Sequence, residues 1–255
     1  MRNILSIAII TWLLTSCATK KEILYFQDAD DYNNATVSYN SPTIQPNDIL
    51  RITVGSLVEE TAIPYNPPRT VSSSTSGGNT GLVKLEGYLV SQDESINFPQ
   101  LGEISTKGKT VKQLELEITQ KLIDGGHLLN PTINVRLLNA KVTILGEVGN
   151  PGTYDFYEEN LTLLQALGYA GDLTINGKRD DILLIRETDG IYTTAHLDIT
   201  SASIMNTPYF YIKPNDVIMV NPNGPKVKSA GYVGNLGSLF SVVSILLSTI
   251  IIITR

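Results

Sequence analysis

The chain has 255 residues and a formal net charge of −6, and charged residues make up 17% of it. The length suits one or two folded domains, and an acidic chain without a basic stripe excludes a nucleic-acid-binding protein, which must neutralise phosphates. The single cysteine excludes a disulfide framework and a thiolate metal site.

The first segment, residues 1–16, has the pattern of a secretion signal. Arg2 supplies a positive charge, and Ile4 to Leu14 form an apolar core with no stop-transfer flank after it. The sequence Leu14-Thr15-Ser16-Cys17 resembles the lipobox of bacterial lipoproteins, in which the signal is cleaved before the cysteine and that cysteine is acylated. The resemblance implies that Cys17 is lipidated and holds the N-terminus at a membrane; the alternative is an incidental cysteine.

Residues 17–43 contain few apolar runs and are rich in Asp, Asn, Tyr and Lys. This composition predicts a lipidated tether between the membrane and the folded domains. The Ser/Gly-rich segment from Ser72 to Gly81 predicts a loop inside the first domain.

A short motif occurs twice, at Ile44 to Asp48 and at Ile212 to Asp216. Both copies read Ile-x-Pro-Asn-Asp and lead into an apolar run. Proline fixes φ, asparagine tolerates a left-handed conformation, and aspartate accepts hydrogen bonds from nearby amides. Each copy therefore predicts a tight turn into a strand, one near the start of the first folded region and one near the end of the second.

In the first region, "GYLVSQDESINFPQLGEI" predicts a hairpin and "TVKQLELEITQKLIDGG" a helix. Thr110 and Gln113 have the spacing of a capping box, and Gly125 is expected to end the helix. One apolar stripe consists of Val111, Leu114, Ile118 and Leu122. A strand, "TINVRLL", follows Pro131.

The second region repeats this style with strands "KVTILGEV", "DILLIRE" and "DVIMV" and a short helix, "TLLQALGYAG". Thr162 and Gln165 again predict a capping box, and Pro151-Gly152 predicts the centre of a type II turn. Apolar helix stripes of this kind usually face a core, so we assign no chemistry to either helix.

The C-terminal residues 236–254 are apolar and follow a linker at 223–235. As a helix, 19 residues extend about 28 Å, close to the roughly 30 Å hydrocarbon core of a bilayer, so the sequence predicts a single transmembrane helix. Four serines share one face of it and are pore-facing candidates: Ser238, Ser241, Ser244 and Ser248. The equally weighted alternative is that small serines only allow close helix packing.

Catalytic and metal-binding patterns are weak. The only histidines, His127 and His196, have no metal-ligand spacing, and His196 and Asp198 are too close in sequence to make a triad alone. The acidic pairs are expected to be solvated loop charges: Glu59-Glu60, Glu158-Glu159 and Asp180-Asp181. We therefore expect no enzyme activity, no metal and no cofactor.

Two longer segments resemble domains of one bacterial family. The segment "INFPQLGEISTKGKTVKQLELEITQKL", followed by "NPTINVRL", resembles the polysaccharide export domain of outer-membrane exporters. The segment "VTILGEVGNPGTYDFYEENLTLLQALGYAGDLTINGKRDDILLIRE" is similar to the soluble-ligand-binding β-grasp (SLBB) domain usually fused to it. The resemblance implies an α+β fold with the export domain at 44–139, the SLBB domain at 140–222 and a single C-terminal transmembrane helix.

The same resemblance implies a lipid-anchored outer-membrane protein with periplasmic domains, assembled as a homo-oligomeric ring, with an octamer as the family expectation. The ring would be a passive conduit for capsule or exopolysaccharide. Its implied partners are the polysaccharide substrate, outer-membrane lipid and an inner-membrane polysaccharide copolymerase or tyrosine kinase. The alternative is a periplasm-facing lipoprotein whose β-grasp domain binds glycan or peptidoglycan without forming a pore.

Overall fold

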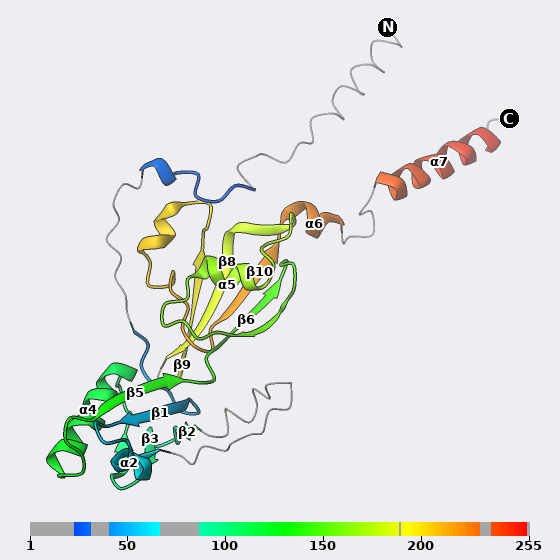
Figure 1. Ribbon diagram of the computed structural model, residues 1–255. Coiled ribbons are helices and arrows are strands. Elements are labelled where there is room, and N and C mark those ends of the chain that lie inside the picture. Colours follow the sequence, from blue (N-terminus) through cyan, green and yellow to red (C-terminus); the bar gives the residue numbers. More distant parts are fainter. Residues whose placement is uncertain (1–22, 32–40, 67–86, 189, 230–235, 254–255) are drawn as a thin grey trace.

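The computed structural model describes residues 23–31, 41–66, 87–188, 190–229 and 236–253. The chain contains both helices and strands, so the expectation of a mixed helix and strand fold is confirmed. Buried side chains form two hydrophobic cores, one within residues 44–135 and the other within residues 140–220. Figure 1 shows the two units built on these cores, the first at the bottom of the view and the second above it.

The first unit is built on a three-stranded antiparallel sheet in the order β2-β1-β5. β1 and β5 pair from Leu50 opposite Leu137 to Gly55 opposite Thr132, and a separate hairpin joins β3 to β4. The strands are β1 (Ile49–Gly55), β2 (Tyr88–Leu89), β3 (Ser95–Phe98), β4 (Gly102–Ser105) and β5 (Thr132–Leu137). Two short helices, α2 (Glu59–Ala62) and η3 (Ile63–Tyr65), follow β1.

One long helix, α4 (Val111–Asp124), covers one face of this sheet. The predicted capping box is confirmed, because the Thr110 hydroxyl accepts a hydrogen bond from the Gln113 amide and the Gln113 side chain accepts one from Thr110. Three residues of the predicted stripe are fully buried: Leu114, Ile118 and Leu122. The helix ends before Gly125 as expected, although the left-handed residue that follows is Gly126, with φ +67°.

The second unit holds a five-stranded sheet in the order β7-β6-β10-β8-β9 with a short helix, α5 (Leu163–Tyr169). β10 runs parallel to β6 and the other neighbours pair antiparallel. The strands are β6 (Lys141–Gly146), β7 (Gly152–Asp155), β8 (Gly177–Thr188), β9 (Ile191–Leu197) and β10 (Val217–Pro222), with η4 (Ala202–Asn206) between the last two. This unit therefore combines short strands with one short helix, as the sequence pattern predicts.

Local predictions for the second unit have mixed outcomes. The capping box at Thr162 and Gln165 is confirmed. The type II turn at Pro151-Gly152 is wrong, because such a turn needs a positive φ at its second central residue and Gly152 has none. Gly152 instead begins β7.

The two Ile-x-Pro-Asn-Asp motifs fold as copies of one turn. Their asparagines are both left-handed, with φ +70° at Asn47 and +68° at Asn215. In each copy the aspartate accepts a hydrogen bond from the amide three residues earlier, at 2.8 Å for both Asp48 and Asp216. The predicted turns leading into strands β1 and β10 are therefore confirmed.

The two aspartates differ in what surrounds their carboxylates. Asp216 and Arg186 form a buried bidentate ion pair, with Nε to Oδ1 at 2.9 Å and Nη2 to Oδ2 at 2.6 Å. Asp48 is only 4% exposed, and none of the described cations forms an ion pair with it. Burial raises the pKa of Asp48 to about 6, and the hydrogen bond from Gln45 opposes this shift.

Part of the predicted tether lies against the second unit. The Phe26 and Gln27 amides donate hydrogen bonds to the carbonyls of Ile199 and Thr200, at 3.1 and 2.7 Å. Asp28 accepts hydrogen bonds from the Ala202 amide and then the Ser201 hydroxyl, which lower its pKa. We call residues 24–31 the strap.

The Tyr25 side chain fixes the start of the strap. Its hydroxyl donates to Asp172 at 2.6 Å, and the buried guanidinium of Arg179 lies 5.4 Å from the centre of its ring. Burial, followed by the hydrogen bond to Asp172, raises the pKa of Tyr25 to about 12. The strap is therefore bonded to the second unit through side chains as well as through the backbone.

After β10 the chain forms α6 (Gly224–Ser229) and α7 (Leu236–Ile253). α7 has 18 residues, equivalent to about 27 Å. Among the helices in the described ranges, none combines the length and hydropathy needed to cross a membrane. The predicted transmembrane helix at 236–254 therefore has no support from this part of the chain, and Thr254 lies outside the described residues.

Candidate functional site

The face of the first sheet that points away from α4 is open and polar. Alternation along β1 buries Leu50, Ile52 and Val54, and alternation along β5 buries Ile133 and Val135. The residues between them are exposed on the opposite face. We call this the outer face; it consists of Arg51, Thr53, Thr132, Asn134 and Arg136.

Strand register brings the two arginines of the outer face together. Arg51 lies directly opposite Arg136, and Thr53 lies opposite Asn134. Like charges directly opposite each other destabilise a sheet, and within the described residues no carboxylate forms an ion pair with either arginine. The pair is therefore a local positive site on an acidic protein.

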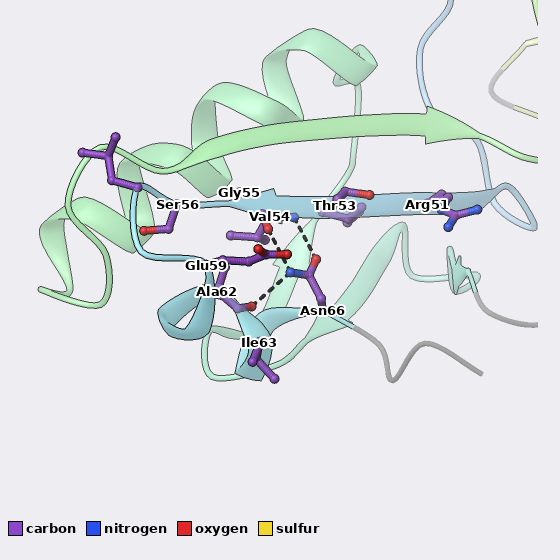
Figure 2. A pocket seen from close by; sticks show the side chains of 11 residues that line it. Arg51, Thr53, Val54, Gly55, Ser56, Glu59, Ala62, Ile63 and Asn66 are labelled. Atoms are coloured by element: carbon purple, nitrogen blue, oxygen red, sulfur yellow. Dashed lines mark hydrogen bonds between the residues drawn. The ribbon is translucent and has the colours of Figure 1, made fainter. Parts of the chain in front are cut away.

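A groove of about 740 Å³ adjoins this face, between β1 and the α2–η3 segment, as Figure 2 shows. This volume is in the range of small-ligand pockets. Its lining is mixed: Arg51, Thr53, Ser56, Glu59 and Asn66 are polar, and Ile52, Val54, Leu57, Ala62 and Ile63 are apolar. Leu57 and Ile63 are 86% and 64% exposed, so the rim is apolar.

Asn66 fixes the width of the groove. Its side-chain amide donates to the carbonyls of Val54 and Ala62, at 2.8 and 3.0 Å, and its Oδ1 accepts from the Val54 amide at 2.9 Å (Figure 2). The side chain thus occupies the edge of β1 as a neighbouring strand would. This arrangement holds η3 against the sheet and leaves Arg51 and Thr53 accessible.

The predicted membrane residues are only partly described. Cys17 lies outside the described residues, and so does the side chain of Ser238. The other three serines are exposed on α7, where the Ser241 and Ser248 hydroxyls donate to the carbonyls of Gly237 and Ser244, at 2.9 and 2.8 Å. These two hydroxyls need no partner outside the helix. Their hydrogen bonds therefore do not distinguish a pore lining from a surface that packs against another helix.

The histidines lie in separate places. His127 contacts Tyr65, with Nδ1 3.2 Å from the hydroxyl oxygen. His196 bonds Asp181 across strands β8 and β9, while Asp198 accepts from Thr200. Hydrogen bonds from Lys178 and then His196 lower the pKa of Asp181.

The acidic pairs were expected to be loop charges, and this expectation is wrong for some of them. Asp180 and Asp181 lie within β8, and Glu59 lies in α2 and lines the groove. Glu158 is an exposed residue whose pKa is lowered chiefly by backbone hydrogen bonds. Across the described ranges, no three His, Cys, Asp or Glu side chains are grouped as metal ligands.

Part of the outer face could be predicted from the sequence. Alternation in "ILRITVG" and "TINVRL" assigns each arginine to the exposed side of its own strand. It does not give the register that places Arg51 opposite Arg136, because the two strands are far apart in the sequence. The groove was missed for a different reason: its lining lies within residues 51–66, and its form depends on the hydrogen bonds that Asn66 makes back to Val54, which no helix or strand periodicity predicts.

Comparison with known proteins identifies two domains. Residues 37–138 match the family described as polysaccharide biosynthesis/export protein, and residues 141–192 match the SLBB domain. These matches fall on the first unit and on most of the second.

Two relatives are both named EPS I polysaccharide export outer membrane protein EpsA. The one from Ralstonia solanacearum is 29% identical over 152 residues, which cover 56% of this chain and 38% of the relative. The one from Ralstonia nicotianae is 33% identical over 110 residues, which cover 42% of this chain and 28% of the relative. The chain therefore matches well under half the length of either relative.

Proposed function

The chain belongs to the polysaccharide biosynthesis/export protein family, and from this premise we propose that it exports polysaccharide across the outer membrane. The observation that carries the proposal is the match of both folded units, in the expected order, to an export domain and an SLBB domain. The relatives named as polysaccharide export outer membrane proteins support the same function and location. We propose a binding and conducting role rather than an enzymatic one.

We further propose that several copies form a closed ring around a passive conduit. Energy for export would come from the machine that makes the polymer, through an inner-membrane copolymerase or tyrosine kinase. The apolar segment 236–254, which contains no charged residue, would enter the outer membrane and bring its serine face to the ring interior or to a neighbouring helix. This part of the proposal is supported by the sequence and the family alone.

The strap limits how far an acylated Cys17 could lie from the second unit. Only eight residue steps separate Cys17 from Tyr25, so an acylated Cys17 would hold the second unit within about 28 Å of the membrane surface. The segment containing α6 and α7 also leaves from this unit, directly after β10. Both apolar ends would therefore fix the same unit to the membrane.

Lipidation at Cys17 is tested by mass spectrometry of the protein extracted from membranes. The expected N-terminal peptide begins at Cys17 and carries acyl chains, because the lipobox is cleaved before the cysteine. Cys17→Ser is expected to retain Met1 and to bind membranes less firmly. An unmodified Cys17 in the mature wild-type protein would exclude the lipid anchor.

Export is tested by deleting the gene and measuring polysaccharide inside and outside the cell. The expected result is continued synthesis with loss of polysaccharide from the surface, and recovery when the wild-type gene is returned. As a control, the activity of the polysaccharide synthase is measured in the same strain, and retained activity distinguishes lost export from lost synthesis. Unchanged surface polysaccharide in a strain with no second exporter would instead favour a glycan-binding lipoprotein.

A further inference from the structure

We propose that the outer face of the first unit binds an acidic polysaccharide, with Arg51 and Arg136 together holding a sugar carboxylate. The proposal rests on the proposed export function and adds the chemical class of the substrate. It concerns a site that the polymer contacts as it passes, rather than a tight receptor site.

The arginine pair of the outer face carries an unbalanced positive charge. Arg51 and Arg136 are exposed and directly opposite, on a chain with a net charge of −6. Their mutual repulsion lowers the stability of the sheet, and none of the described carboxylates forms an ion pair with either guanidinium. Two guanidinium groups side by side present several planar donors, which match the geometry of a carboxylate.

The side chains beside the arginine pair carry hydroxyl and amide groups. Thr53, Asn134 and Thr132 continue the same face beyond the arginines. Residues on one face of a strand repeat every second position, or about 6.7 Å, so these hydroxyl and amide groups form a row along the sheet. Such a row can hydrogen-bond the hydroxyls of successive sugars while the arginines hold the acid group.

The composition of the outer face favours a sugar over an acidic protein partner. The core of a protein interface is normally apolar or aromatic, whereas all five side chains of the outer face are polar or charged. The face is also continuous with the groove through Arg51 and Thr53, which line both. An extended polar ligand suits the open outer face.

Binding is tested with the full-length protein in detergent, using oligogalacturonate as the probe and its methyl ester as a neutral counterpart of the same backbone. Titration calorimetry should detect the acid form and not the ester, and binding should weaken as NaCl rises from about 50 to about 500 mM. The double variant Arg51→Gln/Arg136→Gln should bind at least tenfold more weakly. The matched control, Lys107→Gln/Lys112→Gln, removes two charges elsewhere in this unit and should bind as the wild type does.

The double variant should fold and unfold at the same or a higher temperature, because a repulsion has been removed. Equal binding of acid and ester, or equal binding by wild type and double variant, would overturn the proposal. Dispersal of the assembled protein by the double variant alone would assign the arginines to a subunit contact instead. Loss of binding is measured on purified protein, so failure of export in cells would not be mistaken for failure of this site.

Discussion

Asp216→Asn is expected to lower the free energy of unfolding of the second unit by about 3 to 5 kcal/mol, the usual cost of breaking a buried ion pair. Asn keeps the shape of the side chain and can still accept from the Lys213 amide. It leaves Arg186, only 6% exposed at its side chain, without its counter-charge. The remaining bonds from Arg186 to the carbonyls of Pro208 and Tyr211 do not neutralise the guanidinium.

The same substitution in the matching turn should change the free energy of unfolding in the opposite direction. Asp48→Asn is expected to raise the stability of the first unit at pH 7, because the wild type there holds an ionised carboxylate that burial disfavours. A pKa raised from 3.8 to about 6 corresponds to about 3 kcal/mol, which we take as an upper limit for the gain.

The pH dependence of Asp48 follows from the direction of its shift. The folded state binds the proton more tightly than the unfolded chain, so this contribution to stability is complete below about pH 3.8 and is lost as the pH rises through about 6. In the wild type, stability of the first unit should therefore fall between these values. Asp48→Asn should remove that slope.

Amide hydrogen exchange of the full-length protein measures the two units separately. Exchange from β6, β8 and β10 should become faster in Asp216→Asn, and exchange from β1 and β5 should become slower in Asp48→Asn at pH 7. Loss of stability in both variants would contradict the difference that we assign to the two carboxylates.

Val243→Asp is expected to abolish assembly of the proposed ring, whereas Ser244→Asp is expected to retain it. The two positions are adjacent and point about 100° apart on α7. A charge that faces hydrocarbon costs about 2.5 to 3.5 kcal/mol on insertion scales, and a ring repeats this cost in every subunit. Size-exclusion chromatography of the extracted protein gives the assembled fraction.

The control for this comparison is Val243→Ala, which removes the side-chain bulk without adding a charge and should assemble. Ser244→Cys should also react with a water-soluble thiol reagent if the serine face borders water. Equal loss of assembly from Val243→Asp and Ser244→Asp would remove the pore role of the serines and leave the segment as a second anchor.

Helix caps and tight turns could be predicted from the sequence, because each depends on residues that are close together in the chain. The capping boxes at Thr110 and Thr162 and the left-handed Asn47 and Asn215 were all predictable from neighbouring residues. β9 was missed, because it is an edge strand with most of its residues exposed and so lacks the alternation of a half-buried strand.

Contacts between residues that are distant in the sequence could not be predicted from the sequence patterns. The Arg186–Asp216 pair and the Arg51–Arg136 pair both depend on strand register. The strap was read as a tether because its composition is polar, although Tyr25 and Phe26 pack against the second core. Polar composition predicts flexibility only when the polar groups find no partners, and partners such as Asp172 and Ala202 are distant in sequence.

The central claim, a conduit for polysaccharide, is tested most directly by electron microscopy of the full-length protein extracted from its membrane. Particle images should show closed rings of identical subunits around a central channel, with the first units at one end and the lipid-bound segment at the other. Single subunits or open, irregular clusters, in a preparation that retains the acylated Cys17, would contradict the conduit.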